Sequence, residues 1–269
     1  MTPGPLLHEP YDVFRSSITP AALYARQKWL GESSTAKWQA DFAAAVAELY
    51  QGQSADGLWQ GSPVETIHRL FGLHLTVRRL DPRIGNGLDA LVRIVSDAKA
   101  NKCSDGVPAA RLRGLPFTQG SRQGLILPAT LFLCAIFGRA NDPAVLALYH
   151  RMTDGLNAET LRREKPSSIH NLLRALVVHP QYFAAQATHC VVAWLADRQT
   201  RQGAWGPEIP FYQALNALAH LDTPAANQQT EVAFKHLLAT QHADGTWGES
   251  DPQWCTFLAV HALRNKGIE

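Results

Sequence analysis

Residues 239 to 248 read ATQHADGTWG and follow directly on an apolar stretch with helical periodicity. Gln241, Gly245 and Trp247 in this stretch give the spacing Gln-x-x-x-Gly-x-Trp. The same spacing occurs in two more places, QSADGLW at 53–59 and QTRQGAW at 199–205. The last two copies start 42 residues apart, at positions 199 and 241, a period typical of proteins built from repeated helical hairpins.

Each copy of the motif lies between one apolar helical stretch and the next, so the motif predicts a connection. Its glycine can adopt the positive φ that follows a helix end, and the Asp or Gln before it can bond the turn backbone. The tryptophan can cover the end of a neighbouring helix. The glutamine amide can pair with helix-end backbone groups that otherwise have no partner.

Apolar residues at three- and four-residue spacing predict an all-α protein. Prolines 82, 143, 166, 180, 210 and 252 stand near the starts of helical stretches, where proline is tolerated. Paired in order, the stretches give about five helical hairpins, with a further helix near Ala21 to Leu30. The predicted helices are Gln39–Tyr50, Val64–Leu80, Leu88–Ala100, Leu125–Phe137, Ala144–Asp154, Ser168–Val178, Phe183–Asp197, Phe211–Leu221, Thr230–Thr240 and Gln253–Arg264.

Composition excludes several classes of protein. With 25 basic and 23 acidic residues the formal charge is +2, and no basic cluster alternates with aromatic residues, so nucleic acid is not an expected partner. Four widely spaced cysteines without a Cys-x-x-Cys pair indicate free thiols in a reducing compartment. The start of the chain has no secretory signal and no stretch predicts a membrane span, so we expect a cytoplasmic protein. Peripheral membrane contact and the oligomeric state stay open.

Three longer stretches carry a family resemblance: QSADGLWQGSPVETIHRL, QTRQGAWGPEIPFYQALNAL and QHADGTWGESDPQWCTFLAVHAL. They resemble the QW repeats of the terpene cyclase and protein prenyltransferase superfamily. The resemblance implies an α/α toroid, in which inner and outer rings of about five to six helical hairpins surround a central cavity. No linker or shift in composition divides the chain, so we expect one domain over residues 1–269, with residues 1–37 as an N-terminal extension packing on the ring.

The catalytic residues of the squalene-type cyclases are not matched. Those enzymes protonate an alkene with an Asp-x-Asp-Asp sequence, and this chain contains no Asp-Asp pair. Alignment of three helices on the prolines that open them, at positions 63, 210 and 252, leaves Glu65 as the only carboxylate at the aligned positions. Glu65 is interpreted either as a general acid or base tuned by His68 and His170, or as part of a helix cap with Ser62.

Aromatic residues at the aligned helices suggest a lining for an apolar substrate. Aromatic ring faces stabilise carbocations, although ordinary core packing explains the same residues. The predicted substrate-binding residues are Phe71, Phe132, Tyr212, Gln213, Trp254 and Phe257.

Metal-ligating residues are sparse. Asp251 and Cys255 are four residues apart and His261 lies on the same helix, which suggests weak candidates for a metal site. The superfamily's zinc site uses Asp-x-Cys with a histidine on a later helix, so the pattern departs from it, and Asp251 also suits the first turn of a helix. Glu65 with His68 forms a further carboxylate and imidazole pair.

The sequence therefore predicts an enzyme that acts on an apolar, isoprenoid-type substrate within a central cavity and requires no cofactor. Two alternatives stay open. One is a metal-dependent enzyme that uses histidine and carboxylate ligands for a transition metal in the same cavity. The other is a lipid-binding or scaffold protein without catalytic activity.

Overall fold

The computed structural model describes residues 6–97, 107–118 and 122–268. Apart from isolated bridges, the described residues form helices and no strands, so the all-α prediction is confirmed. Every predicted helical stretch contains a helix, and two short helices, α1 (Asp12–Arg15) and α8 (Ala158–Arg163), were not foreseen. Among the described residues, no helix combines the length and hydropathy that crossing a bilayer requires.

Five helices begin with the same local signal, a capping Ser, Thr or Asp followed by proline. The cap's side-chain oxygen accepts a hydrogen bond from the backbone N–H three residues later, and proline in the first turn has no N–H to leave unpaired. These caps precede α2, α4, α5, α12 and α13. Pro180 does not act in this way, because it lies in a turn and the following helix starts only at Gln186.

The chain forms two compact units. The N-terminal unit comprises Phe14–Leu115 and Gln119–Met152, and the C-terminal unit comprises Met1–Val13, Pro116–Thr118 and Thr153–Glu269. The single domain, the extension 1–37 and the closed ring with a central cavity all stay predictions.

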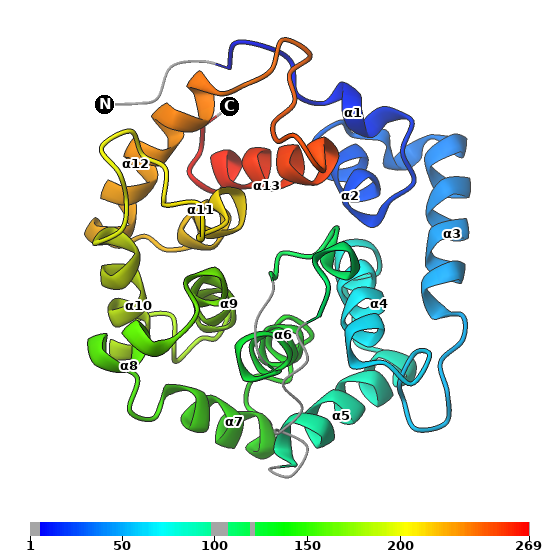
Figure 1. Cartoon of the computed structure of the whole chain (residues 1–269). Coiled ribbons are helices and arrows are strands. Elements are labelled where there is room, and N and C mark those ends of the chain that lie inside the picture. Colours follow the sequence, from blue (N-terminus) through cyan, green and yellow to red (C-terminus); the bar gives the residue numbers. More distant parts are fainter. Residues whose placement is uncertain (1–5, 98–106, 119–121, 269) are drawn as a thin grey trace. The chain divides into compact units, whose positions relative to one another are not determined.

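In the N-terminal unit, α4 packs between α2 and α6, while α3 and α5 pack along this row (Figure 1). Tyr149 fixes α7 to α6 through a hydrogen bond to the Leu131 carbonyl. The unit contains α2 (Pro20–Lys28), α3 (Ala36–Tyr50), α4 (Pro63–Thr76), α5 (Pro82–Ser96), α6 (Arg122–Ile136) and α7 (Pro143–Thr153), with short 3₁₀ turns η1 (Glu32–Ser34) and η3 (Ala109–Leu112).

In the C-terminal unit, α11 packs between α9 and α13, and α10 and α12 cover this row (Figure 1). Both units therefore have two layers of helices, as expected for stacked helical hairpins. The unit contains α8, α9 (Pro166–Val177), α10 (Gln186–Ala196), α11 (Phe211–Leu218), α12 (Pro224–Ala239) and α13 (Pro252–Asn265).

All three copies of the repeated motif have the same geometry. In each copy the glutamine Nε2 donates to the carbonyl of the motif glycine at 3.0 Å and to a carbonyl of another segment at 2.9 Å. The second acceptors are Arg83 in α5 for Gln53, Gln229 in α12 for Gln199, and His8 for Gln241. The motif is therefore a clamp between a turn and the segment packed on it.

The glycines of the clamps are required for two reasons. Gly57, Gly203 and Gly245 have φ of 90°, 93° and 83°, in the region that favours glycine. A Cβ on Gly203 would lie 2.6 Å from the carbonyl carbon of Val232, and the other two glycines meet backbone equally closely. The turn can approach the neighbouring backbone only because no side chain stands between them.

All three clamp tryptophans are buried, and two of them cap helix ends, as the sequence predicted. Trp205 Nε1 donates to the Leu195 carbonyl at the end of α10, and Trp247 Nε1 donates to the Leu237 carbonyl near the end of α12. These bonds satisfy carbonyls that the helix ends would otherwise leave unpaired.

The third clamp holds the N-terminal segment instead of a following helix. Gln241 bonds both the N–H and the carbonyl of His8, and Gln253 Nε2 donates to the Val13 carbonyl at 2.9 Å. In the C-terminal unit, residues from the start of the chain therefore occupy the place that α5 and α12 occupy at the other two clamps.

Candidate functional site

Glu65 lies in the first turn of α4. Its backbone N–H donates to the Ser62 hydroxyl at 3.3 Å, so the predicted Ser62 cap is confirmed. In a full capping box the Glu65 carboxylate would also accept from the Ser62 N–H. Here the Ser62 N–H donates to the Trp59 carbonyl instead, and the Glu65 carboxylate pairs with Arg69 Nε at 2.7 Å. The carboxylate is partly exposed and its charge is offset by a guanidinium.

His68 lies one turn further along α4, on the face that carries Glu65. Its Nε2 is 2.6 Å from the Arg111 carbonyl, which can only accept, so Nε2 carries the proton. Burial lowers the pKa of His68, while the Arg111 carbonyl and the Glu65 carboxylate act in the opposite direction. At neutral pH this imidazole is therefore a neutral hydrogen-bond donor.

Aromatic side chains gather between α4 and α6. The Phe71 and Phe132 rings are 6.2 Å apart and both side chains are buried. The His74 ring makes T-shaped contacts with the rings of Phe132 and Phe137, with centroids 6.1 Å apart in both pairs. The two predicted substrate-binding phenylalanines are thus neighbours, in a group suited both to core packing and to contact with an apolar ligand.

His170 on α9 is completely buried. Its Nε2 is 3.4 Å from the Thr118 hydroxyl, and its Nδ1 has no hydrogen-bond partner among the described residues. Burial, with a smaller contribution from Arg174, lowers the pKa of His170 to about 3. His170 is therefore neutral at physiological pH and is a weaker base than an ordinary histidine.

A buried polar row connects α9, α11 and α13. Arg174 donates to the Asn216 side-chain oxygen and to the Gln213 carbonyl, both at 3.0 Å. Asn216 in turn donates to the Leu258 carbonyl and contacts His261 Nδ1 at 3.3 Å. Burial lowers the pKa of Arg174 to about 9, so the guanidinium stays charged at neutral pH.

Side chains of α13 continue this row as an aromatic stack. The Trp254 and Phe257 rings are stacked at 5.2 Å, and Phe257 lies 5.9 Å from His261. Burial lowers the pKa of His261 to about 4. The three predicted residues of α13 are thus brought together, while Gln213 enters the row through its backbone carbonyl.

The candidate metal ligands of α13 do not form a cluster. Among the described residues, no group of three His, Cys, Asp or Glu side chains is placed to hold a metal ion. Asp251 instead caps α13 by accepting from Trp254 N–H. Burial, and secondarily Asp251, raises the pKa of Cys255 to about 12, and burial also raises the pKa of Tyr212 to about 12.

The candidate residues divide between the two units. Glu65, His68, Phe71 and Phe132 belong to the N-terminal unit, and the other predicted site residues belong to the C-terminal unit. A single site containing both sets therefore stays a prediction. Sequence reasoning missed Arg174, although an arginine within the apolar helical run IHNLLRALVV was a usable signal.

Comparison with known proteins gives limited matches. No protein-family model matches the chain. The ent-copalyl diphosphate synthase of Streptomyces sp. (strain KO-3988) is 35% identical over 68 residues, which cover 23% of this chain and 13% of that protein. A crystal structure of a protein from Actinoplanes has a TM-score of 0.55 at 16% identity, and the match covers 93% of this chain and 89% of that one. The first match is a partial likeness to a terpene cyclase, and the second shows a shared fold.

Proposed function

We propose that this protein is a terpene cyclase-like enzyme that acts on an apolar, isoprenoid-type substrate. The observation that carries the proposal is the 35% identity to ent-copalyl diphosphate synthase over 68 residues. The three Gln-Gly-Trp clamps give independent support, because the terpene cyclase superfamily is the one that their sequence resembles. The match spans 13% of the named synthase, so its whole activity does not transfer by similarity alone.

Two aromatic groups support the choice of substrate. Phe71 with Phe132, and Trp254 with Phe257, place ring pairs on helices α4, α6 and α13. Aromatic faces attract cations and pack against hydrocarbon, and a carbocation formed from an isoprenoid has both properties. In this proposal these four side chains, with Tyr212 and Gln213, line the substrate site.

Glu65 is the acid or base of the proposal. The Arg69 ion pair fits the role of a base better than that of an acid, because a base acts as the carboxylate and the ion pair is made with the carboxylate. A carbocation that loses a proton to Glu65 becomes an alkene, and no other reactant is needed for this step. His68 and His170 are neutral, so they position groups through hydrogen bonds and do not supply protons.

The test is turnover by the purified chain on a panel of linear isoprenoid diphosphates and isoprenoid hydrocarbons, with products identified by gas chromatography and mass spectrometry. We expect a cyclised product from at least one substrate, and a loss of about 100-fold or more for Glu65→Gln. Glu231→Gln is the matched control, since it removes another ion pair at i,i+4, with Lys235. Undiminished turnover by folded Glu65→Gln would show that Glu65 has no such role.

A further inference from the structure

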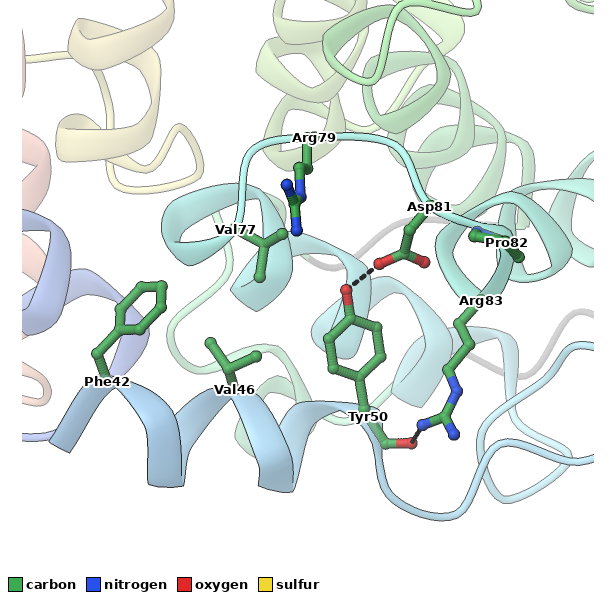
Figure 2. Close-up of a pocket in the computed structure, with 8 residues that line it drawn as sticks. All are labelled: Phe42, Val46, Tyr50, Val77, Arg79, Asp81, Pro82 and Arg83. Atoms are coloured by element: carbon green, nitrogen blue, oxygen red, sulfur yellow. Dashed lines mark hydrogen bonds between the residues drawn. The ribbon is translucent and has the colours of Figure 1, made fainter. Parts of the chain in front are cut away.

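A pocket in the N-terminal unit lies apart from the residues considered so far. Its volume is about 770 Å³, within the range of about 300–1,000 Å³ that small-molecule sites occupy. It opens between α3 and the loop that joins α4 to α5 (Figure 2). Its lining consists of Phe42, Val46, Tyr50, Val77, Arg79, Asp81, Pro82 and Arg83.

One side of the pocket is an apolar face of α3. Phe42, Val46 and Tyr50 are spaced by four residues, so their side chains follow one another along the same face of the helix (Figure 2). The Phe42 ring stacks on the Trp38 ring of the same helix, with ring centroids 4.7 Å apart. Val77 lies opposite, so a chain of methylene groups placed along α3 has apolar atoms on both sides.

The pocket lining carries a net positive charge. It contains two arginines, Arg79 and Arg83, and one carboxylate, Asp81. Asp81 accepts from the Tyr50 hydroxyl and from the Ile84 N–H, the latter at 2.9 Å, so its carboxylate is held at the start of α5. Two guanidiniums against one carboxylate leave one positive charge in excess in the lining.

The two arginines differ in how they are held. Arg83 donates to the Tyr50 carbonyl at 3.4 Å and its guanidinium lies 5.7 Å from the centre of the Tyr50 ring. Arg79 is directed from the loop into the pocket, and within the described part of the chain it has no carboxylate partner (Figure 2). Arg79 is thus a guanidinium that an incoming anion can bind without first breaking an ion pair.

We propose that this pocket binds a free single-chain amphiphile with an anionic head, a carboxylate or a phosphate. The head contacts Arg79, and the hydrocarbon chain lies along Phe42 and Val46 against Val77. The separation of charge from apolar surface within one pocket fits this ligand, since a purely apolar ligand would bury Arg79 without a partner. The proposal does not depend on the terpene cyclase-like function.

The test is isothermal titration calorimetry of the full chain with dodecyl phosphate and dodecanoate, both kept below micelle-forming concentrations. We expect saturable binding of at least one of them, dodecanol weaker by about tenfold or more, and no binding of inorganic phosphate. Arg79→Gln removes the cation from an exposed side chain, and we expect about tenfold weaker binding of the amphiphile.

Matched variants on α3 separate the pocket from the rest of the surface. Val46→Asp places a charge in the apolar wall and is expected to weaken binding about tenfold, whereas Ala47→Asp and Lys37→Gln alter exposed neighbours and should change the affinity less than about twofold. The proposal is overturned if neither amphiphile binds, if Arg79→Gln and Val46→Asp bind like the unmodified protein, or if the chain binds only vesicles of anionic phospholipid.

Discussion

The substitution Gly203→Ala tests whether the clamps depend on close backbone approach. The new Cβ would lie 2.6 Å from the Val232 carbonyl carbon, and an ordinary carbon contact is about 3.5 Å, so α12 must move by about 1 Å. Alanine at the positive φ of 93° adds about 1–2 kcal/mol. Loss of the two Gln199 bonds adds about 0.5–1.5 kcal/mol each, giving a total of roughly 2–5 kcal/mol.

The assay is urea unfolding followed by tryptophan fluorescence, with two controls in the same unit. Gly155→Ala has the positive φ of 68° but open space around it, so we expect a loss of only about 1–2 kcal/mol. Gly206→Ala has neither feature and should stay within about 0.5 kcal/mol of the unmodified protein. If Gly203→Ala is no less stable than Gly155→Ala, close approach is not what the clamp glycine provides.

Two other predictions concern the C-terminal unit. Gln241→Ala removes the acceptor of the His8 N–H, so hydrogen exchange of that amide should accelerate about tenfold. Gln199→Ala is the control and should leave this exchange rate unchanged. Equal exchange rates in both variants would contradict the clamp at the N-terminal segment. Folding lowers the pKa of His170 from 6.5 to about 3, so below pH 6.5 the unfolded chain binds more protons than the folded chain. The free energy of unfolding should therefore fall by roughly 2 kcal/mol when the pH is lowered from 7 to 5. Urea unfolding of His170→Gln at both pH values should show that much less loss, and an identical loss would show that His170 does not titrate on unfolding.

The helices could be predicted from the sequence because their signals are local. Apolar periodicity placed α3 to α7 and α9 to α13, and the Ser, Thr or Asp before proline explains where five helices begin. The start of α10 was placed too early, at Phe183, because Pro180 was taken as a helix start. Pro180 instead follows His179, whose buried ring accepts the Gln181 N–H and packs edge-on against Tyr182, so tertiary packing holds this segment as a turn.

The candidate site could be predicted only as a set of residues. Trp254, Phe257 and His261 share one helix, and helical spacing brings their rings together. The sequence suggested the first two for substrate binding and the third for a metal site. The Arg174–Asn216 hydrogen bond joins two residues that are 42 positions apart in the sequence, and no local pattern indicated it. The same holds for the amphiphile pocket, whose cations come from a loop and from α5 and whose apolar wall comes from α3.

The sequence by itself determined the helical class, most helix positions and the three turns that carry Gln, Gly and Trp. These features depend on contacts within a few residues, which spacing along the chain encodes. Only the tertiary structure decided the partners of the turns, such as His8 for Gln241 across 233 residues, and the partners of the buried Arg174. Such pairs depend on which distant segments pack together, and packing is a sum over many weak contacts that no single stretch of sequence specifies.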